Sequence, residues 1–182
     1  RTIVGEETRF NVIIKHMRRL RRYDRQGISE QQMMASSFAA SAKTSHVGEF
    51  RDWGVYQNTQ LPGNKCYALT VPSSFLPAGV RHGDNFIIIS KSGGGYSPQL
   101  VMGYQLKADS TVRVMVDGAQ FPFFTEGNRA WAQNEGDEAR IINAMRSGRS
   151  VNVQATSVRG TQTRYTFSLM GLSASLQRVD RC

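Results

Sequence analysis

The stretch that decides the fold is residues 112–172, VRVMVDGAQFPFFTEGNRAWAQNEGDEARIINAMRSGRSVNVQATSVRGTQTRYTFSLMGL. Valines alternate with other residues from Val112 to Val116. Asp117-Gly118 then supplies the pair typical of a type I′ turn, in which both central residues need a positive φ. The pattern predicts a hairpin that returns along Ala119 to Thr125. Pro122 predicts an edge strand or a bulge there, because proline cannot donate a hydrogen bond to a neighbouring strand.

A short helix is predicted after this hairpin, at Glu138 to Ser147, because large apolar residues recur there at helical spacing. Asp137 is expected to cap the N-terminus of the helix through its side chain. Gly148 is expected to end the helix in the left-handed conformation. The residues that share the apolar face are Ile141, Ile142 and Met145.

A second hairpin and a last helix complete the stretch. Residues 151–155 and 165–169 each alternate apolar with polar side chains, and Arg159-Gly160 lies between them as a turn. The last helix is expected to start near Leu172. The apolar residues of the two strands are Val151, Val153 and Ala155, then Tyr165, Phe167 and Leu169.

Six segments of the chain, which follow one another in the same order as in the family, resemble the invasion-associated locus B family of exported alphaproteobacterial proteins. Three lie in the deciding stretch: VDGAQFPFFTEGNRAWAQ, DEARIINAMRSG and VQATSVRGTQTRYTFSLMGLSASLQRVD. Upstream come FRDWGVYQ, KCYALTVPSSFLPAG and VMGYQLKADS. The resemblance covers about Phe50 to Cys182, and residues before about Ser45 lie outside it. It implies a small, mainly β, exported domain without assigned catalytic residues, so we expect neither an enzyme nor a cofactor.

Two cysteines, Cys66 and Cys182, stand far apart in the chain. Their spacing fits neither a zinc site nor a CxxC redox pair, which leaves a disulfide or two free thiols. The family resemblance favours the disulfide, because an exported domain folds in an oxidising compartment. On the entropic model, closing a loop of this length stabilises a domain by roughly 4 to 5 kcal/mol.

The charge of the chain is strongly basic and unevenly distributed. The formal net charge is +9, of which residues 1–45 carry +5 and the remaining residues +4. A basic excess favours an acidic partner, such as anionic lipid, nucleic acid or an acidic protein surface, but it also occurs as a plain solvated face. No apolar run approaches the length of a membrane span. Because Arg1 is not an initiator residue, we expect that the chain has been processed or trimmed.

Residues 1–45 are predicted to form a basic amphipathic helical extension of two helices. The first runs from Glu6 to Arg25 and has an apolar stripe at helical spacing, with basic residues around the rest of its surface. The second runs from Glu30 to about Ala42, after a capping box at Ser29. The residues predicted to bind a partner are Phe10, Ile13, Ile14, Met17 and Leu20 on the stripe, with Arg18, Arg19, Arg21 and Arg22.

Such an extension is too small to form its own core, so its stripe must be buried on something else. The favoured surface is the β domain behind it or a protein partner, and an anionic membrane surface is a second option. Nucleic acid is disfavoured. A helix-turn-helix would read bases with its second helix, whereas the basic residues here lie on the first.

The chain from residue 46 to 182 is predicted to be a β domain, reached through a linker at Ser45 to Gly48. Trp53 is expected in its core, and Pro72 to Gly83 is expected to be a surface connection. Gly93 to Gly95 fits a hairpin connection better than a phosphate loop, because no Lys-Ser/Thr follows. The strands predicted before residue 112 are residues 50–57, 65–71, 86–91 and 99–106.

No catalytic constellation is apparent. His16, His46 and His82 are scattered and are expected to be solvated at the surface. Acidic residues gather near the short helix, where capping and first-turn charge explain most of them, and a calcium or acid/base site is the alternative. Most aromatic residues are expected in the core. Phe123 and Phe124 should point to opposite faces of their strand, with the N-terminal helices as candidates to cover the outer one. The acidic residues are Glu126, Glu135, Asp137 and Glu138.

The predicted fold is a mainly β, antiparallel β-sandwich of about eight strands. One short inserted helix, a C-terminal helix and an N-terminal α-helical hairpin are added to it. The predicted function is a non-catalytic structural or interaction protein, located in the periplasm or at the cell surface. The alternative is an accessory subunit of a larger membrane-associated complex, in a bacterial envelope or a mitochondrial intermembrane space. A third class, an enzyme or ligand carrier, would require a deep polar pocket between the sheets.

Overall fold

A computed structural model describes residues 44–58 and 66–182. The first strands are β1 (Thr44–Phe50), β2 (Trp53–Asn58), β3 (Cys66–Thr70), β4 (Ser74–Leu76), β5 (Phe86–Ser92) and β6 (Gly95–Val101). β7 (Thr111–Val116), β8 (Ala119–Glu126) and β9 (Arg129–Ala132) follow, then a 3₁₀ turn η2 (Glu135–Asp137) and helix α2 (Glu138–Ser147). The chain ends with β10 (Ser150–Thr156), β11 (Gln162–Ser168) and helix α3 (Leu172–Asp180). The predicted N-terminal helices lie outside the described residues.

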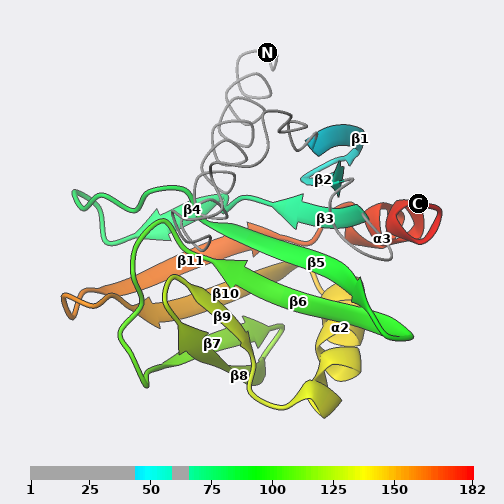
Figure 1. Cartoon of the computed structure of the whole chain (residues 1–182). Coiled ribbons are helices and arrows are strands. Elements are labelled where there is room, and N and C mark those ends of the chain that lie inside the picture. Colours follow the sequence, from blue (N-terminus) through cyan, green and yellow to red (C-terminus); the bar gives the residue numbers. More distant parts are fainter. Residues whose placement is uncertain (1–43, 59–65) are drawn as a thin grey trace, which may run out of the picture.

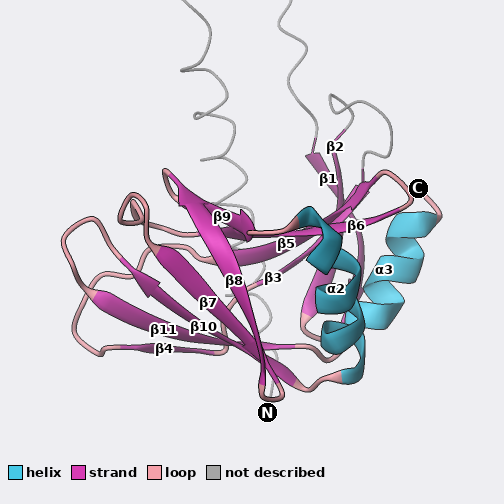
Figure 2. Ribbon diagram, turned by 90° about the horizontal axis from the view of Figure 1, so that it is seen from below, coloured by secondary structure: helices cyan, strands magenta, loops and turns pink. Residues whose placement is uncertain are grey.

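The described strands form one antiparallel sheet of eleven strands, in the order β1-β2-β3-β5-β6-β9-β8-β7-β10-β11-β4. The sheet curves so that its two halves lie on either side of one core (Figure 1). Trp53 and Ile89 from one half and Val114 and Phe167 from the other belong to the same buried cluster. Helices α2 and α3 lie side by side and add apolar residues to it (Figure 2). Within the described residues, no helix is long and apolar enough to cross a membrane.

The prediction of about eight strands in a sandwich was therefore too simple. The fold is mainly antiparallel β with the predicted inserted and C-terminal helices, but the described strands are continuous rather than split into two sheets. Three strands were missed, namely β1, β4 and β9. The predicted linker at Ser45 to Gly48 was wrong, because these residues pair with β2 from residue 55 to residue 57. The predicted strand at 99–106 instead lies at Gly95–Val101, because Gly93-Gly94 forms the turn after β5.

The first predicted hairpin is confirmed, with one correction. Asp117 and Gly118 both have positive φ, 46° and 88°, as the turn prediction required. Pro122 was predicted at an edge or a bulge, but β8 is an interior strand between β7 and β9. The proline is tolerated because it lies just beyond the β8–β9 pairing, which starts at Phe123. There its carbonyl accepts a hydrogen bond from the amide of Gln133.

Helix α2 has the predicted bounds and buries its predicted face, but both predicted caps were wrong. The Asp137 side chain makes no capping hydrogen bond and pairs with Arg140 at 3.3 Å, because η2 already continues the helical backbone. Gly148 has φ −85°, outside the left-handed region. A Cβ at Gly148 would lie 2.8 Å from the Val116 side chain, so close packing explains the glycine.

The second hairpin and the last helix are confirmed. β10 and β11 pair in register from Ser150↔Ser168 to Thr156↔Gln162, with Gly160 at φ 85° in the turn. Gly171 precedes α3 at φ 98°. A Cβ there would lie within 1.8 Å of the Phe50 carbonyl oxygen, so this glycine lets the end of β1 meet the start of α3.

Candidate interaction surface

The structure joins Cys66 and Cys182 in a disulfide, as expected from the family resemblance. Cys66 begins β3 and is buried, whereas Cys182 follows α3 and is exposed. The bond therefore ties the end of the chain to the sheet over 116 positions. The residues predicted to bind a partner, Phe10 to Arg22, lie outside the described residues.

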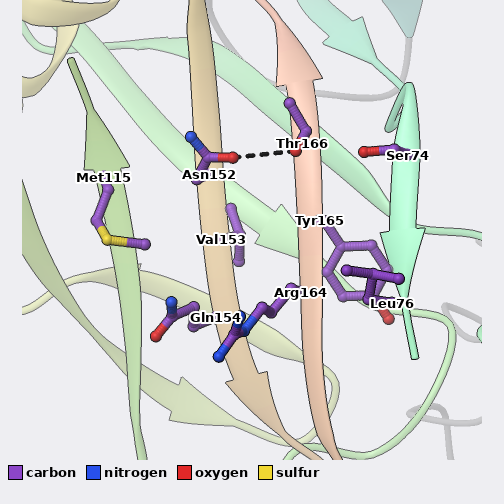
Figure 3. Close-up of a pocket in the computed structure, with 9 residues that line it drawn as sticks. All are labelled: Ser74, Leu76, Met115, Asn152, Val153, Gln154, Arg164, Tyr165 and Thr166. Carbon is purple, nitrogen blue, oxygen red and sulfur yellow. Dashed lines mark hydrogen bonds between the residues drawn. The ribbon is translucent and has the colours of Figure 1, made fainter. Parts of the chain in front are cut away.

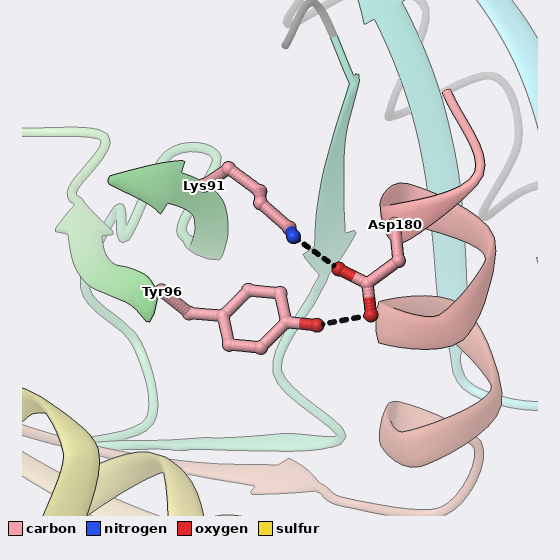
Figure 4. Close-up of polar contacts among 3 residues, drawn as sticks. All are labelled: Lys91, Tyr96 and Asp180. Atoms are coloured by element: carbon pink, nitrogen blue, oxygen red, sulfur yellow. Dashed lines mark hydrogen bonds and ion pairs between the residues drawn. The ribbon is translucent and has the colours of Figure 1, made fainter. Parts of the chain in front are cut away.

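Helix α3 is held by a second, polar contact close to the disulfide. One oxygen of Asp180 pairs with the Lys91 ammonium at 2.8 Å, and the other accepts a hydrogen bond from the Tyr96 hydroxyl at 2.6 Å (Figure 4). The Arg146 guanidinium lies 5.3 Å from the Tyr96 ring centroid. Hydrogen bonds from Lys91 and Tyr96 lower the pKa of Asp180. Burial, together with Asp180, raises the pKa of Tyr96 to about 12.

A buried hydrogen-bond chain lies beneath β4 at the opposite end of the sheet. His82 contacts the Tyr165 hydroxyl through Nδ1 and the Pro77 carbonyl oxygen through Nε2, both at 2.8 Å. The chain continues from Tyr165 to Tyr104 at 3.3 Å and from Tyr104 to Thr163 at 2.6 Å. The prediction that His82 is solvated at the surface was wrong. The connection after β4 folds back and buries its ring against Tyr165.

The outer face of β4, β11, β10 and β7 carries a shallow groove of about 280 Å³. Alternation puts valines of β10 in the core and turns Asn152 and Gln154 outward. Figure 3 shows Arg164 beside Gln154, and Asn152 bonded to the Thr166 hydroxyl at 3.0 Å. Other residues that line the groove are Ser74, Leu76, Met115, Val153 and Tyr165. The groove is polar at its centre and has Leu76 and Met115 on opposite sides.

Strand β4 ends the described sheet next to this groove. It pairs only with β11 in the described part of the chain. Its Phe75 and Leu76 are each 55% exposed. Large apolar residues on an edge strand are a recognised feature of protein contact sites, because the open edge and the apolar surface favour association. The predicted surface connection at Pro72 to Gly83 therefore contains an edge strand that sequence reasoning missed.

The groups considered for chemistry do not converge. Within residues 44–58 and 66–182, no three His, Cys, Asp or Glu residues could together hold a metal ion. Glu138 accepts a hydrogen bond from Ser97, and Asp137 pairs with Arg140, so two of the four acidic residues near α2 have structural partners. Phe123 is buried and Phe124 is exposed, as predicted, and Phe124 stacks on Trp131. His46 is exposed, as predicted, on β1.

The comparisons with known proteins assign the family. The family model "Invasion associated locus B (IalB) protein" matches residues 63–180. The chain belongs to this family. A crystal structure of invasion associated protein b from Bartonella henselae superposes with a TM-score of 0.55 at 16% sequence identity. The match covers 76% of this chain and 96% of that chain, and it shows that the locus B fold is shared. No curated protein sequence matches the chain.

Sequence reasoning missed the groove residues of this locus B domain for a clear reason. Met115, Gln154 and Arg164 occupy ordinary outward positions on three strands that are not all consecutive in the chain. The alternation of β10 and β11 predicted which side chains face outward. It did not predict that β7 and β4 lie on either side of this pair, because strand order depends on contacts between distant parts of the chain.

Proposed function

We propose that this locus B protein is a non-catalytic interaction protein. The observation that carries the proposal is the edge strand β4, where Phe75 and Leu76 are exposed and Leu76 lines the polar groove. Burying such apolar side chains against a partner is favourable by roughly 25 cal/mol for each Å² removed from water. A scaffold that exposes them beside hydrogen-bonding groups is well suited to hold another protein.

The proposed location is an oxidising compartment, the periplasm or the cell surface. The Cys66–Cys182 disulfide supports it, since such bonds persist outside reducing compartments. Membership of a family named for invasion in bacteria is compatible with an envelope location. The state of the two thiols in protein taken from its native source tests this proposal. Quantitative oxidation supports it, and free thiols at both positions would contradict it.

An accessory subunit of a larger membrane-associated complex is the second candidate, in a bacterial envelope or a mitochondrial intermembrane space. The observation that favours it is that the basic, amphipathic residues 1–45 precede the matched segment 63–180. In this case the apolar stripe of the extension binds a protein partner, with an anionic membrane surface as the other option.

A native-source pull-down with full-length variants distinguishes the two candidates. Ile13→Glu with Met17→Glu places two charges on the predicted stripe. Thr8→Glu with Asn11→Glu adds the same charge on the opposite side of the predicted helix and serves as the matched control. If a defined partner set is lost only with the stripe variant, the protein is an accessory subunit held by its extension. If both variants retain the same partners as the unaltered chain, the β domain makes the contact.

A further inference from the structure

Outward side chains on the outer face of β7, β10, β11 and β4 form two rows across the strands. In one row, Gln154 pairs with Arg113 on one side and with Arg164 on the other, and Arg164 pairs with Leu76. In the other, Asn152 pairs with Met115 and Thr166, and Thr166 pairs with Ser74. Each row thus combines hydrogen-bonding groups with an apolar side chain at one end.

The charge of this face is entirely positive. Arg113 and Arg164 are both exposed. Neither forms an ion pair within the described ranges, where the ion pairs are those of Lys91 and Arg140. The four strands contain no aspartate or glutamate. Two guanidinium groups on strands that carry no carboxylate are complementary to carboxylates, with which arginine forms paired hydrogen bonds.

We propose that this face binds an acidic, extended segment of a partner protein that lies across the strands, an inference that rests on the proposed interaction role. Arg113 and Arg164 bind two of its carboxylates. Asn152, Gln154 and Thr166 bond to its backbone, since amide and hydroxyl side chains both donate and accept hydrogen bonds. Leu76 contacts an apolar residue of the segment at the β4 edge.

The spacing of the arginines favours a polypeptide over a small anion. Their strands are separated by β10, which puts the two backbones about 10 Å apart, twice the distance between neighbouring strands. A single carboxylate or phosphate reaches both guanidinium groups only if the two side chains bend toward each other, whereas two carboxylates on one chain meet them without that bending. In a chain of the extended polyproline II form, which has three residues per turn and a rise of about 3.1 Å per residue, every third residue lies on one face and about 9 Å from the next, close to the spacing of the two arginines. The open groove of about 280 Å³ also fits a chain that passes over it better than an enclosed small molecule.

The test uses the full chain and a fluorescent peptide of Glu-Thr-Leu repeats, with a Gln-Thr-Leu peptide as the uncharged match. Binding is measured by anisotropy, and contacts are located by amide shifts in NMR spectra. The variants are Arg113→Gln and Arg164→Gln. Arg181→Gln, at the exposed C-terminal end, removes the same charge far from the groove and is the control. Background binding by the basic residues 1–45 is common to all variants.

The expected result is that each groove variant binds the acidic peptide roughly fivefold to tenfold more weakly, whereas Arg181→Gln binds like the unaltered chain. Amide shifts on β10 and β11 should accompany binding. Equal weakening in all three variants would overturn the proposal, because it would show unspecific charge attraction. Tighter, groove-dependent binding of an acidic polysaccharide would overturn the polypeptide assignment. The pull-down with the stripe variants tests the N-terminal extension, whereas peptide binding tests the groove. A failure of the groove proposal therefore does not decide whether the protein is an accessory subunit.

Discussion

The two ends of this locus B domain use their charges in opposite ways. Around α3, Lys91 is paired with Asp180, Arg146 lies over Tyr96, and a disulfide fixes the chain end. On the outer face near β4, Arg113 and Arg164 have no ion-pair partner among the described residues, and apolar side chains are exposed. The charged groups around α3 are paired within the domain. The arginines and apolar side chains near β4 face solvent. The comparison indicates that the charges at the C-terminal end are used within the domain, which leaves those of the outer face near β4 available for contact.

The largest effect should come from Gly171, at the C-terminal end. Gly171→Ala combines a positive φ with a Cβ within 1.8 Å of the Phe50 carbonyl oxygen, so the start of α3 must move. We expect the free energy of unfolding to fall by at least about 3 kcal/mol in a urea titration.

Gly160→Ala is the matched control for Gly171→Ala. Its φ is also positive, 85°, but nothing lies within 4 Å of the added Cβ. We expect a loss of only about 1 to 2 kcal/mol, from backbone conformation alone. Equal losses in the two variants would show that the contact with β1 does not matter.

Removing the disulfide also tests the contacts of the C-terminal end, and we expect a smaller loss in the free energy of unfolding than for Gly171→Ala. Cys66→Ser with Cys182→Ser should lower the free energy of unfolding by roughly 2 to 5 kcal/mol, because the unfolded chain gains freedom. Thermal unfolding with and without a reductant checks this prediction. The double variant should be insensitive to reductant, and an unaltered chain that is also insensitive would argue against the bond.

Hydroxyl deletions compare the two ends directly. Tyr165→Phe removes a buried hydroxyl that contacts His82 and Tyr104, so it leaves buried polar groups without a partner and should cost about 1 to 3 kcal/mol. Tyr96→Phe removes a hydroxyl from the exposed contact with Asp180 and should cost less. A larger loss for Tyr96→Phe in urea titrations would contradict the expectation that the buried hydroxyl matters more than the exposed one.

The smallest effect concerns pH. Because the pKa of Asp180 is lowered in the folded protein, the unfolded chain binds a proton first as pH falls. The stabilisation is therefore fully present above the unfolded pKa of about 3.9 and is lost as pH falls through the lower folded value. Asp180→Asn should be slightly less stable than the unaltered chain at pH 7, and the difference should shrink below about pH 4. A difference that is the same at both pH values would contradict this assignment.

Local chemistry explains which predictions succeeded. Asp117-Gly118 predicted its turn because both positions need a positive φ, and the apolar spacing of Ile141, Ile142 and Met145 predicted α2 and its buried face. The two caps failed for different reasons, one from distant packing and one from the 3₁₀ turn that precedes α2. Gly148 is glycine because Val116 packs against it, and Asp137 bonds to Arg140 instead of the helix end.

The sequence by itself determined the hairpins, both described helices and the resemblance to the locus B family, since these depend on alternation, turn residues and the order of motifs. Only the tertiary structure decided that eleven described strands form one curved sheet, that His82 is buried, and that β4 lies beside β11 at the edge. The physical reason is that neighbouring strands can be distant in sequence. Ser74 meets Thr166 across a connection that no local pattern encodes, and the candidate groove exists only because they meet.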